Sequence, residues 1–202
     1  MICSEKEYRG SKMITTEAKR MDVRTMTLCG LFAALTAVGA FIRIPMPVVP
    51  FTLQFFFVAL AGVLLGAKRG AMAQMIYVAV GLIGIPVFTK GGGLQYVFEP
   101  SFGYLIGFIV AAYAIGYVSE KLGKVTFRNL LLATLVGISI TYIFGVTHMY
   151  MIFNFYLGKS MSVGAAITAG AITFMPSDFT ACVVTSLVGS KIVPYLRNAK
   201  LI

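Results

Sequence analysis

The stretch FTLQFFFVALAGVLLGAKRGAMAQMIYVAVGLIGIPVF, residues 51–88, places two long apolar runs on either side of the adjacent cations Lys68 and Arg69. The first run covers about residues 51–67 and the second about 70–88. An α-helix rises about 1.5 Å per residue, so a hydrocarbon core of about 30 Å needs about 20 residues. The stretch therefore predicts two membrane-spanning helices, the first rather short, joined by a cationic loop.

The same pattern extends along the chain, because cations concentrate in every second gap between apolar runs. Fourteen of the seventeen Lys and Arg residues lie in the N-terminal tail, after the second run, after the fourth run and at the C-terminus. The other gaps hold only Arg43, Lys90 and Lys159. Cationic loops stay on the cytoplasmic side during insertion. We therefore predict an all-α integral membrane protein with six transmembrane helices and both termini in the cytoplasm.

The six predicted spans lie at about residues 26–44, 51–67, 70–88, 102–119, 129–144 and 161–193. Residues 1–24 are predicted to form a cytoplasmic tail and residues 25–202 a single membrane domain. A cleaved signal peptide is the competing interpretation of the N-terminus, since Val38-Gly39-Ala40 resembles a cleavage site, but the first apolar run is too long for a typical signal core. The aromatic residues 150–156 predict a short interfacial helix on the outer side.

Composition supports the membrane assignment. The chain is 58% apolar and 12% charged, whereas soluble domains are nearer a quarter charged. The net charge of +10 does not indicate nucleic-acid binding, because the cations lie at the ends of the spans, beside anionic lipid headgroups, and are not interleaved with aromatic residues on one face.

The outer loops predict a ligand pocket. Residues 43–54 are proline-rich and barely polar, residues 91–93 are all glycine, and Pro176 interrupts the sixth run. Proline removes a backbone donor, so we expect one helical piece to end near Phe174 and another to begin near Ser177. Irregular backbone at membrane depth is tolerated only inside the protein or along a cavity. Tight loops without a ligand are the alternative interpretation.

Asp178 is the acid that most strongly indicates function. Only Glu99 and Asp178, of seven acids, lie on the outer half, and Asp178 has apolar sequence on both sides. A lone carboxylate at mid-membrane costs about 2.5–3.5 kcal/mol, a cost usually tied to function. We predict that Asp178 accepts hydrogen bonds from N–H groups of a ligand. The alternative is that Ser177 or Asp178 only caps the helix that follows Pro176.

The sequence does not indicate ATP binding, hydrolysis or metal binding. The chain has no Gly-x-x-x-x-Gly-Lys-Ser/Thr motif for ATP, and its single histidine, His148, argues against a hydrolytic triad. The three cysteines have no paired spacing, and no cluster of His, Cys and carboxylate residues predicts a metal. We expect no catalytic residues and no cofactor.

The first apolar run carries small residues at helical spacing, in the pairs Gly30/Ala34 and Ala33/Ala37. A stripe of small residues four apart lets another helix approach closely in lipid. Spacing alone does not decide between packing inside this bundle and docking on another membrane protein.

Several stretches together resemble one family. Residues 44–54, IPMPVVPFTLQ, are similar to the hallmark of the BioY family, the biotin-specific substrate-binding components of energy-coupling factor (ECF) transporters. Residues 64–66, 81–88, the triple glycine and residues 100–108, PSFGYLIGF, also look like that family, and Pro176-Ser177-Asp178 resembles its Pro-Gly-Asp.

The resemblance implies a six-helix S-component in the plasma membrane of a prokaryote, which captures biotin from outside. It also implies a transmembrane coupling protein and two cytoplasmic ATPase subunits as partners, with docking through Gly30/Ala34 and Ala33/Ala37. ATP is then hydrolysed by the partners. An S-component for another carboxylated vitamin such as lipoate, a stand-alone secondary transporter and a membrane-embedded enzyme are the alternatives.

The chain departs from the family pattern at two positions. Many members carry a lysine three residues after the aspartate, where this chain has Ala181, and Glu99 stands where a small or neutral residue is expected. Arg43, Lys90 or backbone amides of the glycine loop are the candidates to bind the ligand carboxylate instead. The ligand-binding residues that we predict are Asp178, Gln54, Thr52, Gly91, Gly92, Gly93, Tyr96, Tyr104 and Pro176.

Overall fold

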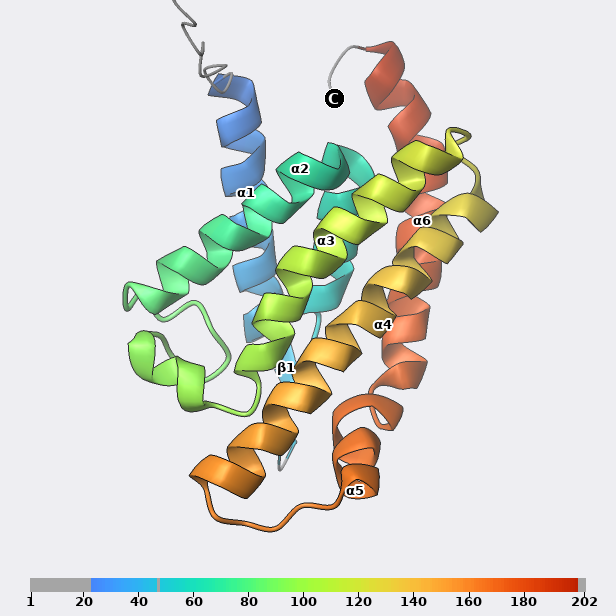
Figure 1. The fold of residues 1–202 in the computed structure, drawn as a ribbon. Coiled ribbons are helices and arrows are strands. Elements are labelled where there is room, and N and C mark those ends of the chain that lie inside the picture. The colour runs from blue at the N-terminus through green and yellow to red at the C-terminus, as the bar shows by residue number, and fades with distance from the viewer. Residues whose placement is uncertain (1–22, 47, 200–202) are drawn as a thin grey trace, which may run out of the picture.

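The computed structural model describes residues 23–46 and 48–199 and is an α-helical bundle (Figure 1). The cytoplasmic tail predicted at residues 1–24 therefore lies almost wholly outside the described residues. The elements, in chain order, are α1 (Val23–Phe41), β1 (Arg43–Ile44), β2 (Phe51–Thr52), α2 (Gln54–Leu82), the 3-10 helix η1 (Leu94–Phe98), α3 (Phe102–Leu122), α4 (Phe127–Met151), the π-helix η2 (Ile152–Tyr156), α5 (Val163–Ile167), the π-helix η3 (Thr168–Ile172) and α6 (Met175–Asn198).

Five helical stretches among the described residues are long and apolar enough to cross a membrane: residues 23–41, 54–82, 102–122, 127–156 and 163–196. Their outer faces carry large exposed apolar side chains, among them Leu31, Val38 and Ile143. Such faces suit lipid rather than water. Two buried hydroxyls within the spans are satisfied locally, since Thr36 and Thr141 each donate to the carbonyl four residues earlier, whereas the buried Thr185 hydroxyl has no hydrogen-bond partner among the described residues.

The predicted second and third spans form one element, α2, which breaks at Gly66. The backbone at Gly66 has φ 80° and ψ −177°, a conformation that glycine adopts without steric cost. Residues 54–65 and 67–82 thus form two limbs, which run in different directions (Figure 1). Oε1 of Glu120, near the end of α3, accepts a hydrogen bond of 3.0 Å from the N–H of Ala67 and so satisfies the first donor after the break.

Two predicted boundaries were wrong. The aromatic residues 150–156 do not form a separate interfacial helix, because α4 runs through Met151 directly into η2. The predicted break in the sixth run is present, but it lies at residues 173–174: η3 ends at Ile172 and the last helix begins at Met175 rather than near Ser177. Pro176 therefore lies in the first turn of α6, where its missing N–H costs no helical hydrogen bond. Ser177 and Asp178 are therefore helical residues, not caps, and the Asp178 N–H donates to Phe174 O.

Small residues bring α2, α3 and α4 close together. A Cβ atom at Gly62 would lie 2.8 Å from Ala112 O, and one at Gly107 would lie 3.0 Å from the Cα of Thr141. Without side chains at these positions the backbones of neighbouring helices approach closely, as is common in membranes.

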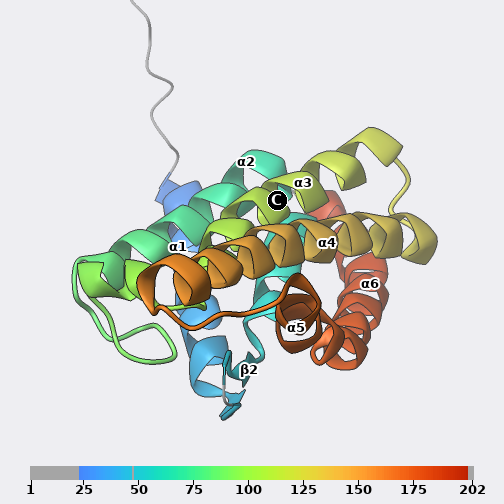
Figure 2. The same cartoon turned by 60° about the horizontal axis from the view of Figure 1, so that its bottom comes forward.

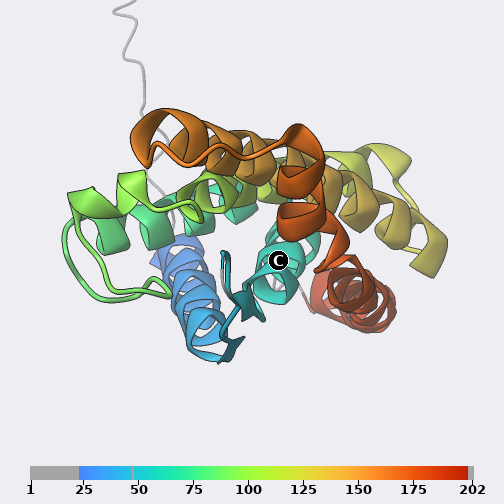
Figure 3. The same cartoon turned by 90° about the horizontal axis from the view of Figure 1, so that it is seen from below.

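One end of the bundle carries the irregular elements. Figure 2 shows β2 and α5 together at this end, with α3 and α4 beside them. Residues 83–101 and α6 lie on opposite sides of the molecule in both Figure 1 and Figure 3. The candidate site is built between these two sides.

Candidate functional site

A cavity lies at the end of the bundle that carries the β1–β2 ribbon. Its empty volume, including the open mouth, is about 560 Å³. Residues 49–55, the loop that ends in η1, and the helices α3, α4 and α6 all contribute lining side chains. The three irregular segments predicted from sequence to converge do so, although Pro176 itself is exposed and absent from the lining.

Asp178 lines this cavity and is held by a neighbouring helix. The hydroxyl of Tyr142 in α4 donates a hydrogen bond of 2.7 Å to Oδ2 of Asp178. No cation forms a salt bridge with Asp178 among the residues that the structure describes. The carboxylate therefore retains acceptor capacity toward the cavity, and one tyrosine fixes its orientation.

A directed chain of hydrogen bonds runs behind the β2 side of the cavity. The Thr52 hydroxyl donates to Gln54 Oε1 at 3.1 Å, Gln54 Nε2 donates to the Tyr77 hydroxyl at 2.8 Å, and that hydroxyl donates to Val87 O at 3.1 Å. Gln54 is buried, so these bonds fix its side chain amide. A primary amide has two N–H donors, and only one of those of Gln54 is used by the described residues.

Three buried hydroxyls form a second network on the η1 side. Tyr96 OH lies 2.8 Å from Thr89 Oγ1 and 3.0 Å from Ser101 Oγ, and all three side chains line the cavity. Tyr104 extends from α3, and its hydroxyl donates to Gly170 O at 2.7 Å. That bond joins α3 to η3, and the Tyr104 ring forms part of the cavity wall.

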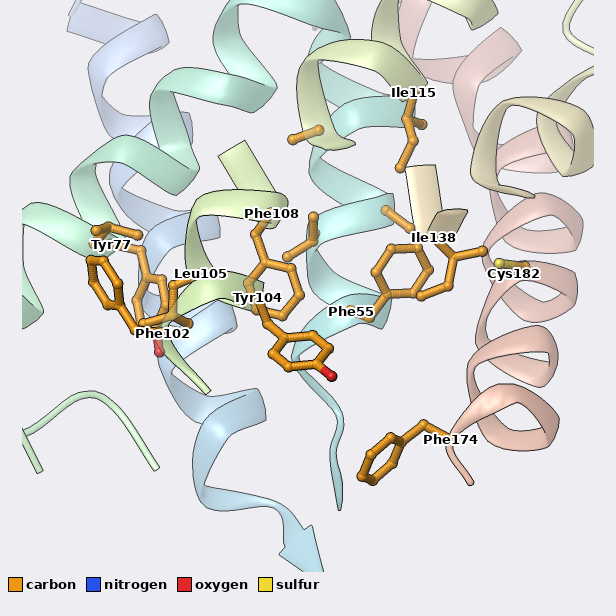
Figure 4. Packing of buried hydrophobic residues seen from close by; sticks show 14 of the residues in the cluster. Phe55, Tyr77, Phe102, Tyr104, Leu105, Phe108, Ile115, Ile138, Phe174 and Cys182 are labelled. Carbon is orange, nitrogen blue, oxygen red and sulfur yellow. The ribbon is translucent and has the colours of Figure 1, made fainter. Parts of the chain in front are cut away.

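The remaining walls are apolar and aromatic. Phe51 and Phe174 stack with ring centroids 6.5 Å apart and planes 13° apart. Figure 4 shows Tyr104, Phe108 and Phe55 between Tyr77 on one side and Ile138 on the other. A cavity with apolar walls and a few fixed polar groups suits a small organic molecule with polar ends.

The structure brings together most, but not all, of the predicted ligand residues. Thr52, Gln54, Tyr96, Tyr104 and Asp178 all line the cavity. Gly91, Gly92 and Gly93 instead shape the loop beside it. Gly91 pairs with Phe88 through two backbone hydrogen bonds, the Gly93 N–H donates to Gly81 O, and a Cβ at Gly92 would collide with Ile85 O. A ligand role for the glycines and for Pro176 stays a prediction.

Sequence reasoning missed Tyr142, Thr89 and Ser101. Tyr142 lies in an apolar run 36 residues before Asp178, and nothing in sequence spacing pairs them. Ser101 stood inside the quoted stretch PSFGYLIGF, and Thr89 directly follows the third apolar run. A hydroxyl beside an apolar run is too common to single out without the fold.

The small residues of α1 divide between two faces. Ala33 is buried in the main core cluster and Ala37 packs against it, whereas Gly30 and Ala34 are exposed. A Cβ at Gly30 would meet no atom of the described residues within 4 Å. Packing inside the bundle therefore accounts for Ala33 and Ala37, and Gly30/Ala34 presents a flat outer stripe.

The two candidate cationic groups for a ligand carboxylate lie outside the lining. Lys90 Nζ forms a salt bridge of 2.7 Å with Glu99 Oε2 across the loop, and both side chains are partly exposed. Arg43 lies exposed in β1. The cavity lining in the described chain thus contains one acid and no base.

Apolar faces for lipid and an internal cavity with one oriented carboxylate define a membrane-embedded solute-binding protein. Known proteins narrow this class. The model of the BioY family matches residues 13–198. A probable biotin transporter BioY of Lysinibacillus sphaericus is 40% identical over 184 residues, covering 91% of this chain and 94% of the relative. The biotin transporter BioY of Thermotoga maritima is 39% identical over 171 residues, covering 84% and 96%.

A solved structure agrees with the sequence relatives. The S-component for biotin from an ECF-type ABC transporter matches with a TM-score of 0.75 and 25% identity, covering 84% of this chain and 90% of that one. The resemblance drawn from the sequence is confirmed, and the chain belongs to the BioY family.

Proposed function

We propose that this protein captures biotin at the extracellular side of a prokaryotic plasma membrane and serves as the S-component of an ATP-driven ECF transporter. Membership of the BioY family supports the assignment of biotin as the ligand, and the cavity supports a role in binding a small molecule. The observation that carries the proposal is that Asp178 is the one charged residue among the described residues that line the cavity, with its carboxylate oriented by Tyr142.

The lining matches the chemistry of biotin part by part. The ureido group offers N–H donors, for which the Asp178 carboxylate is the acceptor. The thioether ring is apolar and packs between aromatic walls such as Tyr104 and Phe108, where burial contributes about 25 cal/mol per Å². Gln54 adds a directed N–H donor. The loop with Gly91, Gly92 and Gly93 would close over the bound ligand.

The proposed topology has six spans with both termini in the cytoplasm. The break at Gly66 separates the two limbs of α2, and the exposed Lys68 and Arg69 lie just after it. A turn at the cytoplasmic surface fits that placement, because cations favour this side. The cavity then faces the opposite side, outside the cell.

The proposed partners are a transmembrane coupling protein and two cytoplasmic ATPase subunits. Gly30 and Ala34 form the exposed small-residue stripe of α1 on which a helix of the coupling protein would pack. The partners supply ATP hydrolysis, and their engagement would tip this protein so that the cavity opens inward.

Calorimetry with the purified full chain in detergent tests the proposal. We expect one biotin per chain with a dissociation constant below about 1 μM, and weaker binding of lipoate. Tighter binding of lipoate would reassign the ligand. Counterflow of labelled biotin in liposomes that contain only this protein would indicate a secondary transporter, and a chemically altered product in mass spectrometry would indicate an enzyme.

A further inference from the structure

The hydroxyl cluster of Thr89, Tyr96 and Ser101 has more donors than its own hydrogen bonds use. Three hydroxyls carry three protons, and the two contacts of 2.8 and 3.0 Å consume two of them. No other acceptor for these hydroxyls is found among the residues that the structure describes. All three side chains are at least nine-tenths buried and line the cavity, so one O–H proton is left at the cavity wall without an acceptor from the described residues.

The other lining hydroxyls are already committed. Tyr104 donates to Gly170 O, Thr141 to Gly137 O, and Tyr142 to Asp178. Thr52 donates to Gln54. Together with the second N–H of Gln54, the cluster therefore supplies the free side-chain donors of the lining within the described chain.

The cluster and Asp178 come from opposite sides of the cavity. Thr89, Tyr96 and Ser101 belong to the segment that joins α2 to α3, and Asp178 belongs to α6. Figure 3 shows that segment and α6 on opposite sides of the bundle. The cavity thus has a side with a free donor and a side with a charged acceptor.

We propose that Thr89, Tyr96 and Ser101 form the subsite for the carboxylate of the ligand, which orients the ligand with its N–H groups on Asp178. This assignment rests on the proposed function. Two like charges in one cavity repel each other, so the ligand carboxylate is driven away from Asp178. Neutral hydroxyl donors then take the place of a cation, which neither Ala181 nor the paired Lys90 supplies.

The test compares biotin with biotinol, the neutral alcohol in which CH₂OH replaces the carboxylate, using the full chain in detergent. The wild type prefers biotin by tenfold or more. The near-isosteric triple variant Thr89→Val, Tyr96→Phe, Ser101→Ala loses roughly tenfold to a hundredfold in biotin affinity, the range for a hydrogen bond to a charged group. Its biotinol affinity changes much less. Thr134→Val, a buried hydroxyl outside the cavity, keeps the preference of the wild type.

The outcomes separate this assignment from the proposed function. A wild type that binds biotin and biotinol equally, or a triple variant with an unchanged preference, overturns the carboxylate subsite while biotin capture stands. A wild type that binds no biotin overturns the proposed function itself. If the triple variant binds neither compound, the three single variants are measured in its place. An unchanged preference for biotin over biotinol in all three rejects the carboxylate subsite.

Discussion

The hydroxyl of Tyr142 lies 2.7 Å from Oδ2 of Asp178 and joins α4 to α6 beside the cavity. This bond stabilises a carboxylate that has no ion-pair partner in the described part of the chain. It leaves the other oxygen, Oδ1, without a hydrogen bond from the described side chains. The pair thus gives the cavity an oriented acceptor.

Replacing Asp178 tests that acceptor. Asp178→Ala should weaken biotin binding by more than roughly tenfold, because a charge-assisted hydrogen bond is lost. Calorimetry measures the affinity, and elution as a single peak in size-exclusion chromatography shows that the variant folds. Unchanged affinity would remove Asp178 from the site.

Tyr142→Phe removes the hydroxyl that orients Asp178 and keeps the ring. We expect a smaller loss, about threefold to tenfold in biotin affinity, since the carboxylate remains but loses its fixed direction. In a double-mutant cycle with Asp178→Ala the two effects should not add, because both residues act through one bond. Additive losses would show that they act independently.

Gly66→Ala tests the break in α2. The backbone there has φ 80°, and an added Cβ would collide with Oε1 of Glu120. We expect the free energy of unfolding to fall by about 2 kcal/mol or more, measured by thermal or denaturant unfolding in detergent. Gly164→Ala is the control, because a Cβ at Gly164 meets no atom within 4 Å. Equal effects of the two changes would mean that the break tolerates side chains.

The outer stripe of α1 provides a test of docking. Ala34→Leu should reduce co-purification with the proposed coupling protein, and the proposed ATP-driven uptake, severalfold, because the side chain prevents close helix approach. Biotin affinity in the isolated protein should stay within about twofold of the wild type. Ala79→Leu makes the same change at an exposed alanine of α2 and should leave both co-purification and biotin affinity unchanged. Loss of co-purification in both variants would argue against a specific stripe.

The salt bridge between Lys90 and Glu99 places two charges next to the cavity residue Thr89. Glu99→Gln should change the free energy of unfolding by less than about 1 kcal/mol, as exposed pairs usually do. It should also accelerate association of anionic biotin at low ionic strength, by up to about fivefold, because Lys90 is no longer neutralised. Stopped-flow binding at low and high salt measures this, and an acceleration that persists at high salt would point to a direct contact instead.

Local sequence was sufficient for much of the fold. Long apolar runs are forced into helices in lipid, because only internal hydrogen bonds satisfy the backbone there. The runs at 102–119 and 129–144 therefore matched α3 and α4 within a few residues at most ends. Boundaries failed at residues 150–156 and 175–178, which lie at or just after the π-helical segments η2 and η3, because a chain can pass from one helical form to another while its backbone donors stay satisfied.

In the candidate site, too, some residues could be identified from the sequence and others only from the fold. Asp178 was identifiable from sequence, since a carboxylate in an apolar run carries a cost that residue type alone reveals. Its partner Tyr142 and the cluster of Thr89, Tyr96 and Ser101 were not, because each is an ordinary hydroxyl until the fold places it beside another.

The amino-acid sequence by itself determined the helical membrane fold, the family and the acid of the cavity, because hydrophobicity, charge placement and short motifs are properties of consecutive residues. Only the tertiary structure decided which hydroxyls surround the cavity, that Lys90 is bound to Glu99, and that Gly30 and Ala34 lie outside while Ala33 is buried. These are relations between helices, and helix packing in lipid depends on close contacts over the whole surface, which spacing along one run does not specify.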